Sequence, residues 1–295
     1  MSFSAILYTA AAIAFFIMMA TRPAVVPENS RQDNNTSAAN STPQVTETQS
    51  ASSNTATTEP DYAREQRMAT EISDAIFDGE VLALNDGSSD FMAIQTDANE
   101  AKGAVIILHG RGFHPDWADV VNPLRTILPE QGWTSLALQM PVLEKKAKYY
   151  DYVPLFPNAG KRISAGIKHL QQQGISNIVL IAHSCGGHMA MQWIRDQGDT
   201  DIGAFIGLGL GATDYQQYMN EPFPLDKMQV PVFDIYGEDD YPAVLKMAPE
   251  RWKLMTAAGN PQSEQRMLTG ADHYFKDKGD ELGELVTNWL NGLKL

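Results

Sequence analysis

Hydrophobic positions change their spacing repeatedly from residue 61 onward. Short uninterrupted apolar runs, typical of buried strands, alternate with stretches in which apolar residues recur at the spacing of an amphipathic helix. The last stretch shows this helical spacing with Leu282, Leu285, Val286, Trp289 and Leu290. The strands expected from these runs are 81–84, 91–94, 104–108, 134–138, 178–181, 204–208, 230–236 and 265–268. The expected helices are 62–76, 117–128, 163–173, a stretch following Ser184 through 194, 243–257 and 282–290.

This alternation of strands and helices predicts an α/β fold for residues 61–295. Strands that alternate with helices form a mainly parallel central sheet with helices on both faces. The first two strands differ, because the turn Asn85-Asp86-Gly87 between them is a hairpin signal. The sequence therefore predicts an antiparallel leading hairpin, followed by a mostly parallel sheet, without an internal repeat.

Residues 1–25 contain an uncharged apolar run from about Ala5 to Ala20. The run is long for the core of a signal peptide and short for a membrane span. No lysine or arginine precedes it, and no clean small-x-small cleavage site follows. Arg22 on its far side argues against export under the positive-inside tendency. We interpret the segment as a hydrophobic signal peptide or membrane anchor, and the sequence leaves both interpretations open.

Residues 26–60 are dominated by serine, threonine, asparagine, glutamine and alanine. Almost no large apolar residue is present to build a core, so the segment is expected to be a disordered linker. A short anchor followed by a neutral tether is typical of a bacterial envelope protein. We therefore expect the domain to be periplasmic, or anchored to the inner membrane and facing the periplasm.

Composition excludes several classes of partner. The 295 residues carry 36 acidic and 22 basic side chains, a formal net charge of −14 that repels phosphate backbones, so no nucleic acid is expected as a partner. The single cysteine, Cys185, cannot form an internal disulfide, and no cysteine and histidine cluster has the spacing of a zinc site. We predict neither a metal nor an organic cofactor. The oligomeric state is not constrained.

The strongest chemical signal is the segment from Ile178 to Gly187, in which four aliphatic residues lead into a serine among small residues. This is the sequence form of a nucleophile elbow, a tight strand-to-helix turn that exposes a hydroxyl above the sheet. Residues two positions before and after the nucleophile must be small. Ser184 meets this condition with Ala182 and Gly186, whereas Cys185 would face His183. Ser184 is therefore the candidate nucleophile, and a plain tight turn is the alternative.

The segment His109-Gly110-Arg111-Gly112 follows another buried strand. A glycine-rich loop there can direct backbone N–H groups at a developing oxyanion, together with the N–H of the residue after the nucleophile. We expect Arg111 and Cys185 to be the donors, with Gly112 next after Arg111. The alternative is a simple turn in which His109 only makes structural hydrogen bonds.

Two further loops supply a carboxylate and an imidazole. His273 follows the last expected strand and precedes the closing helix, where it is suited to be a general base. The loop after strand 230–236 holds Glu238, Asp239 and Asp240, and we favour Asp240, three residues after Gly237, as the partner of that imidazole. Asp239 remains open, and Asp214 is a weaker alternative. The order Ser184, Asp240, His273 is the one expected of serine hydrolases built on this type of sheet.

Two segments near the same sheet edge bear on substrate. The connection between 210 and 230 is rich in aromatic residues and can form a small lid, but it is too short for a cap domain. A second loop holds several lysines and tyrosines: Lys145, Lys146, Lys148, Tyr149, Tyr150 and Tyr152. This loop either recognises an anionic substrate or is simply solvated.

Four motifs resemble the α/β-hydrolase superfamily over roughly residues 75–295: LHGRG at 108–112, AHSCGG at 182–187, YGEDD at 236–240 and GADHYF at 270–275. More narrowly, HGRGFHPDW followed by GWTSLALQMP is similar to an uncharacterised proteobacterial envelope family within it. The superfamily resemblance implies the α/β-hydrolase fold. It also implies a nucleophile, an orienting acid and a base at Ser184, Asp240 and His273, with oxyanion donors at Arg111 and Cys185.

We therefore interpret the protein as a serine hydrolase that acts by acyl transfer on an ester-like bond, as esterases and lipases do, in the bacterial envelope. The expected partner is a small-molecule or lipid-like ester substrate, with a possible N-terminal membrane tether. The alternative hypothesis is a non-catalytic binding or scaffold module with the same fold.

Overall fold

The computed structural model describes residues 58–294. The expected hydrophobic segment at 1–25 and the linker as far as residue 57 lie outside the described residues. Within residues 58–294, every helix is too short or too polar to cross a membrane. Residues 58–60 have no regular secondary structure and lead directly into the first helix, α1 (Tyr62–Ser73).

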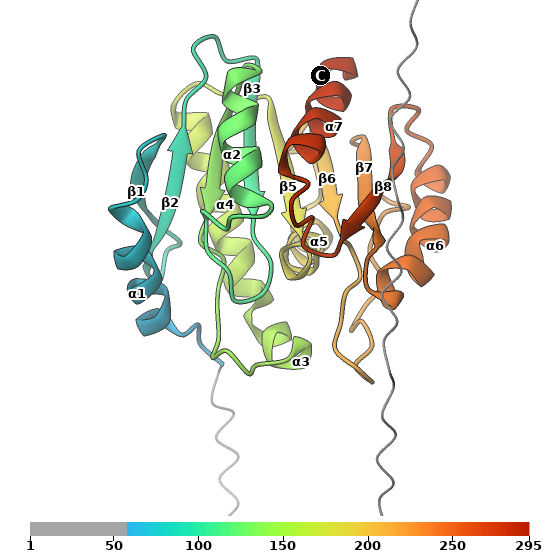
Figure 1. The fold of residues 1–295 in the computed structure, drawn as a ribbon, viewed down its shortest axis with the longest axis horizontal. Coiled ribbons are helices and arrows are strands. Elements are labelled where there is room, and N and C mark those ends of the chain that lie inside the picture. The colour runs from blue at the N-terminus through green and yellow to red at the C-terminus, as the bar shows by residue number, and fades with distance from the viewer. Residues whose placement is uncertain (1–57, 295) are drawn as a thin grey trace, which may run out of the picture. The chain divides into compact units, whose positions relative to one another are not determined.

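The described part of the chain is built on an eight-stranded sheet, ordered β1-β2-β4-β3-β5-β6-β7-β8 (Figure 1). Strand β2 runs antiparallel to both of its neighbours, and all other pairs are parallel. This arrangement confirms the predicted α/β fold with its antiparallel leading hairpin. The strands are β1 (Glu80–Asn85), β2 (Asp90–Thr96), β3 (Gly103–Leu108), β4 (Trp133–Leu138), β5 (Ile178–His183), β6 (Ala204–Leu208), β7 (Val232–Asp239) and β8 (Glu264–Asp272).

Helices cover both faces of the sheet and form two hydrophobic cores. On one face, α2 (Val121–Glu130) and α7 (Gly279–Gly292) pack over the sheet, as the front of Figure 1 shows. On the other face, α4 (Phe156–Gln172) and α5 (Cys185–Gln197) form the second core with the short α3 (Tyr149–Tyr152). Helix α6 (Pro242–Ala258) packs against β7. Strands β3, β5 and β6 are almost continuous apolar runs because they are buried on both faces, whereas the equally buried β4 includes Thr134 and Ser135.

Two helices begin well away from their predicted starts, and smaller differences occur elsewhere, as in α1, which ends at Ser73 instead of residue 76. Helix α2 begins at Val121 instead of residue 117. The residues before it form turns, in which the ring of Trp117 stacks on that of Phe113 with centroids 3.8 Å apart. Helix α4 begins at Phe156 instead of residue 163, and a proline in its first turn, Pro157, suits a helix start. Part of the expected lysine and tyrosine loop is helical as well, as α3 and the 3-10 turn Val153–Leu155.

A buried arginine anchors α1 to the rest of the domain. The guanidinium of Arg162, on α4, donates to Glu65 Oε2 of α1 at 2.9 Å and to the carbonyl of Gln139 at 2.9 Å. It also lies 3.4 Å from Asp86 Oδ2 in the hairpin turn. Burial raises the pKa of Glu65, although Arg162 acts in the opposite direction. These contacts keep α1 beside the loops that follow β3 and β4, at the edge of the sheet where the candidate site lies.

Candidate functional site

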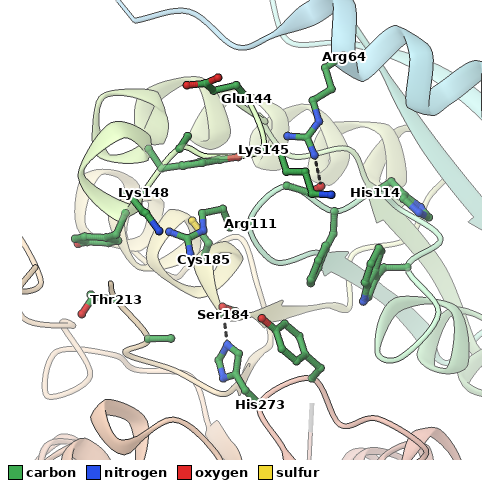
Figure 2. Close-up of a pocket in the computed structure, with 18 of the residues that line it drawn as sticks. Arg64, Arg111, His114, Glu144, Lys145, Lys148, Ser184, Cys185, Thr213 and His273 are labelled. Atoms are coloured by element: carbon green, nitrogen blue, oxygen red, sulfur yellow. Dashed lines mark hydrogen bonds between the residues drawn. The ribbon is translucent and has the colours of Figure 1, made fainter. Parts of the chain in front are cut away.

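A series of three hydrogen-bonded side chains lies at the carboxyl edge of the parallel strands. Ser184 follows β5, Asp240 follows β7 and His273 follows β8. Ser184 Oγ lies 2.8 Å from His273 Nε2, and His273 Nδ1 lies 2.6 Å from Asp240 Oδ1 (Figure 2 shows Ser184 and His273). Because an ionised Asp240 can only accept, His273 carries its proton on Nδ1 and turns the Nε2 lone pair toward the serine hydroxyl. This arrangement can remove a proton from Ser184.

Ser184 occupies the strained turn that the sequence pattern predicts. Its backbone has φ 54° and ψ −117°, a conformation that residues other than glycine rarely adopt. The turn crosses the end of β3 so closely that a Cβ at Gly186 would lie 2.7 Å from the carbonyl oxygen of His109. The Ser184 N–H donates to the carbonyl of Leu208 at 2.9 Å, which ties the turn to β6. The small residue at 186 therefore has a direct steric reason.

The structure selects one acid from the three in the loop after β7. Asp240 is 4% exposed and bonds to His273. Glu238 instead accepts from the N–H of Gly270 at 2.9 Å, and Asp239 is exposed. The alternative Asp239 is thus excluded as the partner of His273 in this geometry. Asp240 also accepts from the N–H of Tyr241 at 2.7 Å, which fixes its orientation.

Two glycines allow the acid and the histidine to meet. A Cβ at Gly237 would lie 2.2 Å from the carbonyl oxygen of Ala271, so only glycine lets the ends of β7 and β8 approach this closely. Gly209, after β6, has φ +60°, and a Cβ there would lie 3.0 Å from the ring of His273. Both positions require glycine because a Cβ would collide with the atoms that pack against them. Gly209 also requires it because of its positive φ.

Cys185 follows the serine and lies buried beside the pocket. Burial raises the pKa of its thiol to about 12, so the sulfur stays protonated and is a poor nucleophile. The backbone N–H of Cys185 is the first of α5 and has no acceptor in the helix. Neither this N–H nor that of Arg111 donates a hydrogen bond anywhere in residues 58–294. Both predicted oxyanion donors are therefore free to bind an oxygen of a ligand.

The loop that carries the Arg111 amide is held by hydrogen bonds on both sides. His109 Nδ1 donates to the carbonyl of Gly110 at 2.7 Å, and its Nε2 accepts from the N–H of Met140 at 2.9 Å. Burial lowers the pKa of His109 to about 3, so this ring stays neutral and has a structural role. On the other side, Arg64 of α1 donates to the carbonyl of Gly112 at 3.0 Å.

Asp214 is the partner of Arg111 and is not bonded to His273. The Arg111 guanidinium makes two hydrogen bonds to the carboxylate, one of them at 3.3 Å, and the N–H of Tyr149 donates to the same group at 2.6 Å. Burial acts to raise the pKa of Asp214, but these donors outweigh it and lower the pKa below its ordinary value. The weaker alternative, in which Asp214 orients the histidine, is therefore wrong.

Several residues of the site were missed by the sequence reasoning. The ring of Tyr241 stacks on His273 with centroids 4.2 Å apart, and its hydroxyl lies 2.6 Å from that of Tyr274. His183 Nε2 donates to the carbonyl of His273 at 2.9 Å, and burial lowers the pKa of His183 to about 3. Tyr241 and Tyr274 directly follow Asp240 and His273 in sequence, and this adjacency could have indicated that they lie at the site. Arg64 offered none.

Ser184 opens into a pocket of about 500 Å³. Its walls come from α1, the loops after β3 and β4, the Ser184 turn, the residues after β6 and the loop that carries His273. From the expected lid, Ala212 and Thr213 contribute to the wall, whereas Tyr215 is 90% exposed. Within residues 58–294, no group of three or more histidine, cysteine or carboxylate side chains is arranged to hold a metal ion.

The family described as "Protein of unknown function (DUF3530)" matches this sequence over residues 11–152 and 158–291. The chain belongs to that family. No curated protein matches it in sequence.

Solved α/β hydrolases share the fold of this chain. An alpha-beta serine hydrolase homologue from Coxiella burnetii is 19% identical, with a TM-score of 0.56 over 72% of this chain and 98% of that one. Est1E from Butyrivibrio proteoclasticus is 16% identical, with a TM-score of 0.55 over 72% and 98%. The Pyrococcus furiosus esterase Pf2001 is 18% identical, with a TM-score of 0.56 over 76% and 94%. At these identities the likeness shows the fold, which is the one that the motifs implied.

Proposed function

We propose that this DUF3530 protein is a serine hydrolase that cleaves ester-like bonds by acyl transfer. The Ser184 hydroxyl attacks the carbonyl carbon, and its proton passes to His273 Nε2 across the 2.8 Å hydrogen bond. Asp240 stabilises the imidazolium that forms. The imidazolium then protonates the leaving alcohol, which departs as the carbonyl re-forms on an acyl-Ser184 intermediate. Water then attacks the acyl carbon and gives a proton to His273. The imidazolium returns this proton to Ser184 Oγ as the acyl C–Oγ bond breaks, which releases the acid and restores the free serine.

The negative charge of each tetrahedral intermediate resides on the former carbonyl oxygen. The free N–H groups of Arg111 and Cys185 support an oxyanion hole for it. Donors of this type contribute about 3 kcal/mol each to the stabilisation of the transition state. The bonds from Arg64 and Asp214 hold the loop of Arg111 in place, so the donors need little reorganisation during the reaction.

The single observation that carries this proposal is the continuous hydrogen-bonded series Ser184–His273–Asp240 with the serine in a strained turn. The decisive test is labelling of the purified chain by a fluorophosphonate, which reacts with an activated serine. We expect labelling of the wild type and of Cys185→Ala, and none of Ser184→Ala. A folded wild type that remains unlabelled would contradict the proposal and favour a binding or scaffold module.

We also propose that the enzyme acts in the bacterial envelope on a small or lipid-like ester. The apolar run at 5–20 and the polar segment after it support this location. Cell fractionation with protease added to intact spheroplasts tests it. Degradation by the external protease is expected, and recovery of the protein only from the cytosol would refute the proposal.

A further inference from the structure

The pocket of Ser184 is positively charged, although the chain as a whole carries a net charge of −14. Four of the side chains that line the pocket are cationic: Arg64, Arg111, Lys145 and Lys148. The one acidic side chain among the lining residues is Glu144. An excess of this kind in an acidic protein concentrates positive potential where a substrate binds.

The acids beside the pocket do not neutralise these cations. Asp214 carries a single negative charge, which it shares between the Arg111 guanidinium and Lys148 Nζ at 3.6 Å. Arg64 donates to the carbonyl oxygens of Leu143 and Gly112 and makes no ion pair with a carboxylate of the described residues. Glu144 and Asp214 offset two of the four cations and leave these six side chains with a net charge of +2. Asp61 and Glu71 line the adjoining groove with Arg64 and Lys145, where Arg67 adds a further positive charge.

The lysines are placed to meet a ligand. Lys145 is exposed and forms no ion pair with a carboxylate of residues 58–294. Its ammonium group is therefore free to bind a ligand. Lys148 is 61% exposed on the same wall. In Figure 2 the four cationic side chains lie on the side of Ser184 away from His273, so they face the part of a bound ester that does not contact the base.

Building on the proposed hydrolase activity, we infer that the substrate carries an anionic group, a carboxylate or a phosphate, and that Lys145 and Lys148 bind it with Arg64 and Arg111 behind them. The reaction at Ser184 is unchanged. What the inference adds is the class of substrate, an ester with a negative charge on its acyl or its alcohol part, in contrast to a neutral fatty acyl ester.

Matched pairs of esters test this inference on the full chain. For the alcohol side, 4-acetoxybenzoate is compared with neutral 4-acetoxybenzamide. For the acyl side, mono-4-nitrophenyl adipate is compared with the corresponding adipic monoamide ester. We expect kcat/KM to favour the anion about tenfold in at least one pair, and we expect the preference to shrink when the salt concentration is raised.

Substitutions of the two pocket lysines are compared with the same substitution at Lys146, a neighbouring lysine outside the pocket. Lys145→Gln combined with Lys148→Gln should reduce the anion preference to about twofold or less, whereas Lys146→Gln should keep it. Lys146 is exposed in the same loop but does not line the pocket. The inference is overturned if no pair favours the anion, if the preference survives in the double variant, or if Lys146→Gln removes it equally.

Failure of the proposed reaction gives a different result. If no ester is cleaved and Ser184 is not labelled by a fluorophosphonate, the hydrolase proposal fails, and binding decides the inference on its own. Calorimetry then compares 4-hydroxybenzoate with 4-hydroxybenzamide. Tighter, salt-sensitive binding of the carboxylate that depends on Lys145 and Lys148 supports the anionic subsite, and equal binding or no binding of the two overturns it.

Discussion

Replacement of Asp240 by asparagine isolates the charge that faces the base. The side chain of Asp240 is fully buried, and its Oδ1 accepts from both His273 Nδ1 and the N–H of Tyr241. An asparagine oxygen at the place of Oδ1 keeps both bonds. Its NH₂ group would replace Oδ2, which accepts only the weak 3.4 Å bond from the Gly237 N–H, and that bond would be lost. The tautomer of His273 is preserved, but the imidazolium loses its counter-charge.

The size of the effect follows from that lost attraction. Two unit charges about 4 Å apart interact by about 4 kcal/mol at an effective dielectric constant of about 20. Since each 1.36 kcal/mol changes a rate by about tenfold, kcat for Asp240→Asn should fall about 10³-fold. An asparagine that turns its NH₂ toward His273 would impose the other tautomer and lower kcat by about 10⁴-fold.

Steady-state hydrolysis of 4-nitrophenyl acetate measures this effect, and thermal unfolding checks that the variant is folded. Asp239→Asn is the matched control, because Asp239 is exposed in the same loop and should keep kcat within about twofold. The reasoning is refuted if folded Asp240→Asn retains more than a tenth of the wild-type kcat. An equal loss in both variants would show that the loop, and not the buried charge, matters.

Three further predictions concern the groups around the site. Cys185→Ala should keep kcat within about threefold, and iodoacetamide at pH 8 should not alkylate the folded wild type, because the thiol pKa is about 12. Gly237→Ala places a Cβ 2.2 Å from the carbonyl of Ala271 and should lower the free energy of unfolding by about 3 kcal/mol, measured by urea denaturation; an unchanged midpoint would contradict it. Burial lowers the pKa of His188 to about 4, below its value of about 6.5 in the unfolded chain. The neutral ring therefore contributes fully to the free energy of unfolding above pH 6.5, and this contribution is lost as the pH falls toward 4. Wild type should lose about 3 kcal/mol over that range through this group, and His188→Gln should show a shallower pH dependence.

Local chemistry explains why so much of the fold was predictable. Buried parallel strands read as apolar runs, and the closing helix α7 shows its inner face in the spacing of its apolar residues. The serine turn is likewise a local matter, since the requirement for small residues at 182 and 186 is visible in ten consecutive residues. Helix starts were less predictable, because at α2 and α4 they depend on contacts such as the stacking of Trp117 on Phe113.

The sequence alone determined the order of strands and helices, the serine and the histidine, because each of these leaves a signal within its own segment. Only the tertiary structure decided which of three neighbouring acids meets His273, that Asp214 belongs to Arg111, and that Arg64 supports the loop of Gly112. These pairs join residues that are far apart in the chain. Such contacts depend on how the sheet brings its loops to one edge, and no periodic pattern in the sequence records them.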